Sequence, residues 1–162
     1  YYETKRWNIT GNIQKDYFMI VEKLNPNIKK IKFLDTGLWY KKDILKFYKQ
    51  DNINNVSQSL IYNMFGSKYD EVQVDSIKNL MNIFGHTHID LLKLDIEGAE
   101  VIVLDKMFDD NIFPKYLCIE FDLYINNKDK EQTTLKLSKR LKELGYEVLI
   151  NNKMNVTFKL CI

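Results

Sequence analysis

The stretch that decides the fold is IDLLKLDIEGAE, residues 89–100. Its first six residues are mostly apolar, as in a strand buried within a sheet, and Asp95 closes the run. Asp95, Glu97 and Glu100 then bring three carboxylates within six positions, with Gly98 among them. Carboxylates are favoured in the first turn of a helix, because the helix dipole attracts negative charge there. We therefore predict a strand over 89–95 that leads directly into a helix over 97–108.

Strands and helices alternate on both sides of this stretch. The other predicted helices are 13–24, a helix that Asp75 or Ser76 caps and that runs to Phe84, and 129–144. The other predicted strands are 30–39, 43–49, 72–74, 116–122, 146–151 and 154–161. Gly145 is expected to end the last helix, and the last two strands to form an antiparallel hairpin. Strand–helix alternation predicts an α/β fold with a mainly parallel sheet.

The last predicted helix, 129–144, is amphipathic. Its apolar side chains are those of Leu135, Leu137, Leu141 and Leu144.

The length of 162 residues fits a single domain, 1–162, with an irregular start over 1–12 and a folded core over 13–162. An apolar fraction of 45% argues against disorder. No apolar run approaches the roughly 18 residues that a membrane-spanning helix needs, and no signal peptide is recognisable. We therefore predict a cytoplasmic protein.

The charges are nearly balanced, with 24 basic and 22 acidic residues. Only Arg6 and Arg140 are arginines, whereas nucleic-acid binders usually carry a basic stripe with arginines for bidentate contacts. This balance predicts no nucleic-acid partner.

The six glycines lie far apart, the nearest two being Gly85 and Gly98. Glycine-rich loops that cradle phosphates need glycines two to five positions apart, so neither common nucleotide-binding loop is present.

The next predicted strand, 116–122, also carries carboxylates near its end, where Glu120 lies between apolar neighbours. Parallel strands bring their carboxyl ends to one edge, so Asp95 and Glu120 are expected to share a cleft. Such a pair can act as a general base, hold a divalent cation or bind a hydroxyl group. Two structural alternatives stay open: Asp95 caps the following helix with Glu97 in its first turn, or Glu120 pairs with Lys93 or Lys115.

Two further polar groups carry weaker signals. His86 and His88 are the only histidines, too few for a zinc site, so a loop or cap role is favoured and no metal ligand is assigned. Ser57 and Ser59 lack the context of a nucleophile elbow, which argues against a serine hydrolase.

The segment IDLLKLDIEGAEVIVL, residues 89–104, closely resembles the signature of the FkbM-type methyltransferases, which are S-adenosylmethionine-dependent O-methyltransferases. The segments 36–39, 57–59 and 72–81 occur in the order that such proteins show. The lead-in to the signature is similar to the branch that includes the methyltransferase-like proteins of animals. The resemblance covers roughly 13–160 and implies a Rossmann-like sheet that ends in an antiparallel hairpin.

The resemblance also implies a difference at the front of the chain. Such enzymes begin with a strand, a glycine-containing loop for the methionine part of the cofactor, and a second strand with an acidic end. Neither strand is recognisable before Lys30, so we expect a chain that lacks the first β-α-β unit and is N-terminally truncated.

The resemblance places three residues beside the adenine of the cofactor: Gly37, Leu38 and Trp39. Asp95 is expected beside the methyl group and the acceptor, as cofactor ligand and as either the base or a ligand of a divalent cation. Glu97 belongs to the signature turn, and Glu120 is expected to support Asp95 from the same cleft. Many relatives have a histidine where this chain has Asp122, so no catalytic histidine is assigned.

These observations predict an O-methyltransferase that uses S-adenosylmethionine and acts on a hydroxyl of a sugar or glycan, a lipid or a small metabolite. A non-catalytic remnant or partner-binding module of the same fold is the alternative. A metal-dependent enzyme of another class, using Asp95, Glu97 and Glu120 with a divalent cation, is a third hypothesis.

Overall fold

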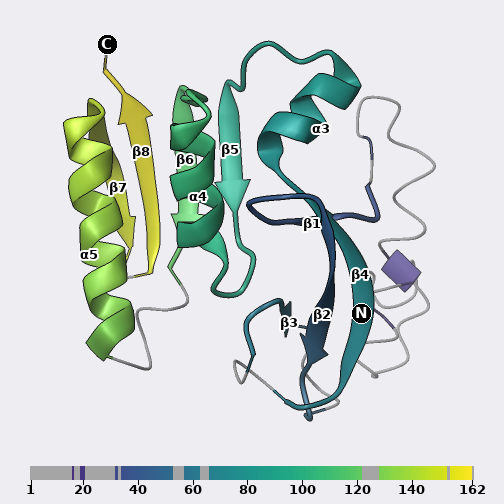
Figure 1. The fold of residues 1–162 in the computed structure, drawn as a ribbon. Helices are drawn as coiled ribbons and strands as arrows, with labels where there is room; N and C mark the ends of the chain where they lie inside the picture. The colour runs from purple at the N-terminus through teal and green to yellow at the C-terminus, as the bar shows by residue number, and fades with distance from the viewer. Residues whose placement is uncertain are drawn as a thin grey trace, which may run out of the picture.

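The computed structural model describes residues 34–52, 57–62, 66–121, 128–152 and 154–161, together with 16, 19, 20 and 32. These residues form a mixed α/β arrangement of two four-stranded sheets with the helices α3, α4 and α5 (Figure 1). Residues 16, 19 and 20 are helical, as the predicted helix 13–24 requires. The rest of that helix and the irregular segment 1–12 lie outside the described residues.

The first sheet, sheet A, has the strand order β1-β4-β2-β3. Its strands are β1 (Gly37–Leu38), β2 (Asp43–Lys49), β3 (Gln58–Ser59) and β4 (Tyr69–Asp75). β1 pairs with β4 in parallel, while β2 is antiparallel to both β4 and β3. The strand predicted over 43–49 from its alternation of apolar and polar residues is confirmed, because β2 has the same bounds.

The second sheet, sheet B, has the strand order β5-β6-β8-β7. Its strands are β5 (Leu91–Leu94), β6 (Tyr116–Glu120), β7 (Tyr146–Asn152) and β8 (Asn155–Leu160). β5 and β6 are parallel, and β8 is antiparallel to β6 and to β7. The predicted C-terminal antiparallel hairpin is therefore confirmed, with an irregularity between Val148 and Ile150.

The prediction of one mainly parallel sheet is wrong for the described part of the chain, because the strands divide into two sheets and only β1–β4 and β5–β6 are parallel. The physical reason is the direct pairing of β2 with β4, since antiparallel neighbours need no crossover helix. Within the described part of the predicted strand 30–39, residues 34–36 are irregular and the strand is confined to β1.

The helix α3 (Ile77–Phe84) begins and ends where its sequence predicts. Ser76 is its N-cap, and the Oγ of this serine accepts a hydrogen bond of 3.2 Å from the amide of Asn79. Gly85 ends the helix with a left-handed φ of 67°.

The helix α4 (Glu100–Asp109) begins three residues later than predicted. Glu97 (φ 54°) and Gly98 (φ 100°) have positive φ angles, so the chain makes a separate turn before the helix starts. The helix α5 (Lys128–Glu143) is followed by Gly145 (φ 88°), which confirms the predicted end of this helix.

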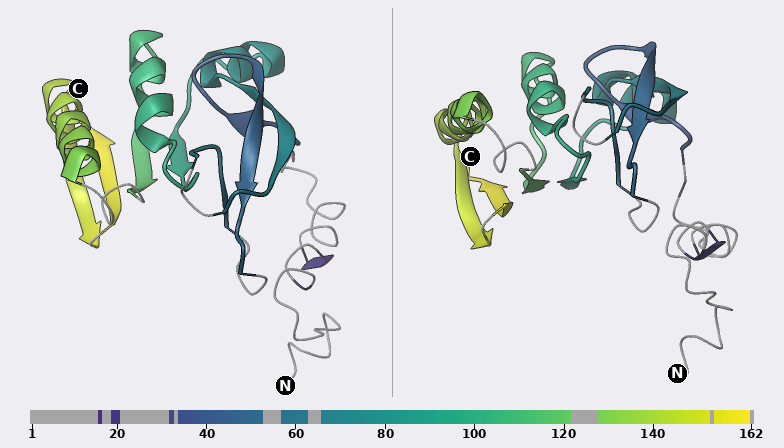
Figure 2. Two further views of the ribbon diagram at one scale, coloured as in Figure 1. Left: turned by 60° about the horizontal axis from the view of Figure 1, so that its bottom comes forward. Right: turned by 90° about the horizontal axis from the view of Figure 1, so that it is seen from below.

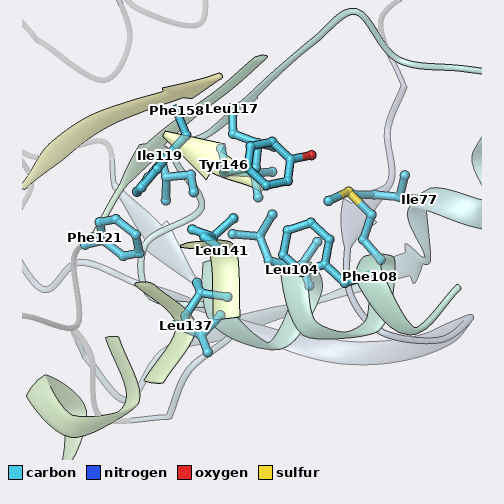
Figure 3. Close-up of a cluster of buried hydrophobic side chains, with 14 residues drawn as sticks. Ile77, Leu104, Phe108, Leu117, Ile119, Phe121, Leu137, Leu141, Tyr146 and Phe158 are labelled. Atoms are coloured by element: carbon cyan, nitrogen blue, oxygen red, sulfur yellow. The ribbon is translucent and has the colours of Figure 1, made fainter. Parts of the chain in front are cut away.

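The helices α4 and α5 cover one face of sheet B (Figures 1 and 2). Leu104 and Phe108 of α4 pack there with Leu117 of β6, and Leu137 and Leu141 of α5 belong to the same cluster (Figure 3). Burial of these side chains is the main stabilisation of the fold.

One predicted member of this core faces away from it. Leu135 is 58% exposed, because a position two residues before Leu137 points to the opposite side of a helix.

The other face of sheet B is covered by no helix among the described residues (Figure 2). Leu91 of β5 is 59% exposed there, and Lys93 is exposed on the same side. The expectation of a strand buried within a sheet is therefore wrong for β5, which lies at the edge of sheet B within the described structure. None of the described helices is long and apolar enough to cross a membrane.

Candidate functional site

A cavity of about 290 Å³ lies between sheet A and the turn that follows β5. Its apolar lining comes from Leu34, Leu38, Phe47, Leu60, Val72 and Ile96. Its polar side chains come from Asp35, Thr36, Gln58, Gln73, Asp95 and Glu97. A mostly apolar hollow with a few polar groups has the composition of a small-molecule site, and its volume is near the lower end of that class.

Gly37 belongs to the same lining and leaves room that a larger residue would fill. A Cβ atom at this position would lie 3.2 Å from the Cγ1 of Val74, the residue that pairs with Gly37 on β4. That distance is tighter than ordinary van der Waals contact, so a side chain here would push the strands apart or enter the cavity. The absence of a side chain lets the backbone itself form this wall.

The turn over 95–99 carries the opposite wall of the cavity, and Glu100 holds it in shape. The side chain of Glu100 is buried, and its carboxylate accepts hydrogen bonds from the amide of Ile96 at 2.9 Å and from that of Gly98 at 3.2 and 3.1 Å. Burial raises the pKa of the Glu100 carboxyl, an effect that these amides oppose and the nearby charge of Asp95 reinforces.

The N-cap position of α4 is held by Ala99, which makes no side-chain capping bond. Asp95 therefore does not cap the helix, and Glu97 precedes the first turn. The structural alternative for Asp95 is wrong, and Asp95 and Glu97 are among the residues that line the cavity.

Ser59 connects sheet A to this turn. Its fully buried hydroxyl donates a hydrogen bond of 2.5 Å to the carbonyl oxygen of Glu97 and accepts one of 3.0 Å from the amide of Ile61. The two walls of the cavity are thus joined by a direct bond between distant parts of the chain.

Lys93 lies between the two carboxylates that end β5 and β6. Its Nζ is 3.4 Å from the Oδ2 of Asp95 and 3.7 Å from the Oε2 of Glu120. The alternative in which Glu120 pairs with Lys93 is therefore confirmed. These groups are partly exposed, and such ion pairs contribute little to stability, typically about 0–1 kcal/mol. The lysine instead joins Asp95 and Glu120 into one charged group at the edge of sheet B.

The structure brings together four of the six residues predicted for the site. Gly37, Leu38, Asp95 and Glu97 line the one cavity. Trp39 is not among the described lining residues; its amide bonds to the carbonyl of Asp75 at 2.9 Å. Glu120 lies on β6 and is connected to Asp95 through Lys93. Asp122 lies outside the described residues.

The sequence reasoning gave no site role to five polar residues that line the cavity or hold its walls, namely Asp35, Thr36, Gln58, Gln73 and Ser59. Asp35 lies near the end of the predicted strand 30–39, so the strand-end rule applied to Asp95 would have found it. The bond made by Ser59 carries no local sequence signal, because its partner Glu97 is 38 positions away.

Metal binding finds no support in the arrangement of the described side chains. Among them, no group of three or more His, Cys, Asp or Glu residues is placed to hold a metal ion. His88 instead lies 3.4 Å from the exposed carboxylate of Asp90.

Comparison with known proteins adds one finding. The sequence model of the FkbM methyltransferase domain matches residues 23–148, which is more than half of the chain and includes every residue that lines the cavity. No curated protein and no solved structure matches the chain. The resemblance predicted from the segment 89–104 is confirmed, and the chain belongs to the FkbM methyltransferase domain family.

Proposed function

We propose that this domain is an S-adenosylmethionine-dependent O-methyltransferase that acts on a hydroxyl of a sugar, a lipid or a small metabolite. The observation that carries the proposal is the meeting of Gly37 and Leu38 with Asp95 and Glu97 in one cavity. The family resemblance assigns the first pair to the adenine and the second to the signature turn beside the acceptor.

The charge of the cavity suits this cofactor. Asp35, Asp95 and Glu97 contribute carboxylates, and no lysine or arginine is found among the described lining residues. When bound, S-adenosylmethionine supplies a methyl group from a positively charged sulfonium. Carboxylates attract such a cation and also accept hydrogen bonds from ribose hydroxyls.

The apolar part of the cavity suits the adenine ring. Leu38, Phe47, Leu60 and Val72 offer apolar surface for a flat aromatic group, and Gly37 leaves the backbone open beside them. We assign the adenine to this side of the cavity, with Trp39 following directly on the wall-forming residues of β1.

Asp95 is the proposed base. Its side chain is about half exposed and belongs to the first residue after β5, so an acceptor hydroxyl can reach it from solvent. Asp95 would accept the proton that the acceptor hydroxyl loses as its oxygen bonds to the methyl carbon, while the bond from that carbon to the sulfonium sulfur breaks and the neutral thioether leaves. Lys93 and Glu120 keep the carboxylate oriented, and Glu97 binds from the cavity wall. Methyl transfer is a displacement that depends mainly on positioning, so few groups are required.

Transfer of a labelled methyl group to a panel of glycans, lipids and small hydroxylated metabolites tests the proposal. Asp95→Asn is expected to lower kcat by about 100-fold or more. Asp90→Asn is the matched control, because this exposed aspartate lies five positions away and its carboxylate pairs with the exposed His88. Full activity of Asp95→Asn would remove the role given to Asp95.

A second candidate, a non-catalytic partner-binding module, is supported by the open face of sheet B with its exposed Leu91. Calorimetry with S-adenosylmethionine separates the two candidates. Binding at a 1:1 ratio supports the methyltransferase, and an absence of binding supports the partner module.

A further inference from the structure

We infer that Ser59 is a positioning residue that locks the peptide group between Glu97 and Gly98, and so holds the two walls of the cavity in register. Its expected effect on cofactor affinity rests on the proposed function. The lock itself is a property of the free protein.

The peptide group between Glu97 and Gly98 is held at both of its polar atoms. Its carbonyl oxygen accepts the hydroxyl of Ser59 at 2.5 Å. Its N–H donates to both carboxylate oxygens of Glu100, at 3.2 and 3.1 Å. A flip of this peptide would break all of these bonds at once, so the pair Ser59 and Glu100 fixes its orientation.

The lock is needed because the backbone on both sides of this peptide has unusual angles. Glu97 has a φ of 54°, which costs a residue with a side chain on the order of 1 kcal/mol or more, and Gly98 has a φ of 100°. Such a conformation persists only when surrounding contacts hold it. Glu100 acts from within the turn, and Ser59 acts from sheet A.

The position of Ser59 explains why this bond sets the shape of the cavity. It is paired with Tyr48 at the edge of sheet A, and its neighbours Gln58 and Leu60 both line the cavity. Its own side chain is fully buried against the turn. The bond therefore connects the cavity wall made by sheet A directly to the wall made by Asp95 and Glu97.

The hydroxyl of Ser59 uses its single donor on the turn. It donates to the carbonyl of Glu97 and accepts from the amide of Ile61. The donated bond leads to the turn, and the accepted one anchors the hydroxyl to its own strand end.

The test uses hydrogen exchange at the amides of Ile96 and Gly98 in the ligand-free chain. Ser59→Ala is expected to speed exchange at both amides by about tenfold. Ser138→Ala is the matched control, because its hydroxyl also donates to a backbone carbonyl, that of Thr134 at 3.0 Å, within α5. The control is expected to leave exchange in the turn unchanged. Where Ser59→Ala fails to fold, Ser59→Cys keeps the volume, weakens the bond and gives the same comparison.

Calorimetry with S-adenosylmethionine gives the second readout. Ser59→Ala is expected to raise the Kd by about five- to tenfold, while Ser138→Ala leaves the Kd unchanged. Unchanged exchange in the turn of Ser59→Ala would overturn the inference, and so would faster exchange without a change in Kd. If the wild-type chain binds no cofactor, the proposed function fails, and exchange alone decides whether Ser59 locks the turn.

Discussion

Replacement of the buried Glu100 tests how the turn beside the cavity is held. Glu100→Ala removes the acceptors of the amides of Ile96 and Gly98 and leaves both donors without their partner. Hydrogen bonds to a charged group are worth about 1.5–3 kcal/mol each, so we expect a loss of about 3–5 kcal/mol in the free energy of unfolding. This is a large share of the about 5–15 kcal/mol that typically stabilises a domain.

Glu100→Gln separates the hydrogen bonds from the charge. The amide oxygen can take the place of Oε1, which accepts from both Ile96 and Gly98, while the buried charge disappears. We expect this variant to unfold within about 1 kcal/mol of the wild type at neutral pH. Glu143→Ala is the control, because its exposed side chain forms a surface pair with Lys139, and it is expected to change stability by about 0.5 kcal/mol or less.

The pH dependence gives an independent check on the same residue. Burial raises the pKa of Glu100 above its unfolded value of 4.5, so the folded state binds more protons than the unfolded state between the two pKa values. The stability that this group contributes is fully present below the unfolded pKa and is lost as the pH rises through the folded pKa. Wild-type protein should therefore gain stability relative to Glu100→Gln as the pH falls.

Urea unfolding of the wild type and the three variants, at several pH values from about 5 to 8, measures both effects. A loss below about 1 kcal/mol for Glu100→Ala would refute the view that this carboxylate holds the turn. A stability difference between wild type and Glu100→Gln that changes with pH in the opposite direction would refute the sign of the pKa shift.

Three further substitutions test other parts of the structure. Glu97→Gly removes the side chain from a residue with a φ of 54°, so it should raise the unfolding free energy by about 1 kcal/mol while it lowers methyl transfer. A melting curve and the labelled-methyl assay measure the two effects, and a variant without higher stability or without lower activity would contradict the prediction. Tyr146→Phe removes the 2.7 Å bond to the carbonyl of Pro114 and should cost about 1 kcal/mol in urea unfolding. Because burial raises the pKa of Tyr146 to about 12, wild-type stability should fall between pH 10 and 12 by a component that the variant lacks, and parallel pH profiles would contradict this. Arg140→Met breaks the pairs of 2.7 and 2.6 Å that join α5 to two aspartates of α4, and should cost about 1 kcal/mol, less at high salt; a loss independent of salt would point to packing instead.

The local elements were predictable because their signals lie within a few residues of one another. The cap of α3 at Ser76 and the end of α5 before Gly145 each depend on neighbours in sequence, and both are confirmed. The strand and helix of the signature were found for the same reason, although the turn at Glu97 and Gly98 delayed the start of α4.

The pairing of strands was not predictable to the same degree. Alternation along 43–49 predicts a strand but does not predict its partner, and in the structure β2 pairs with β4 as an antiparallel neighbour. The exposure of Leu91 followed from the same arrangement, since all three described helices leave its side of sheet B uncovered.

The sequence by itself determined the family, through residues 89–104, and showed that Asp95, Glu97 and Glu100 follow a strand directly. The tertiary structure decided which role each of the three has: Glu100 is buried and binds the backbone of the turn, whereas Asp95 and Glu97 are among the residues that line the cavity. It also decided that Ser59 reaches Glu97 across 38 positions. The physical reason is that a helix or a cap depends on contacts between near neighbours, whereas a cavity exists only where distant segments pack together.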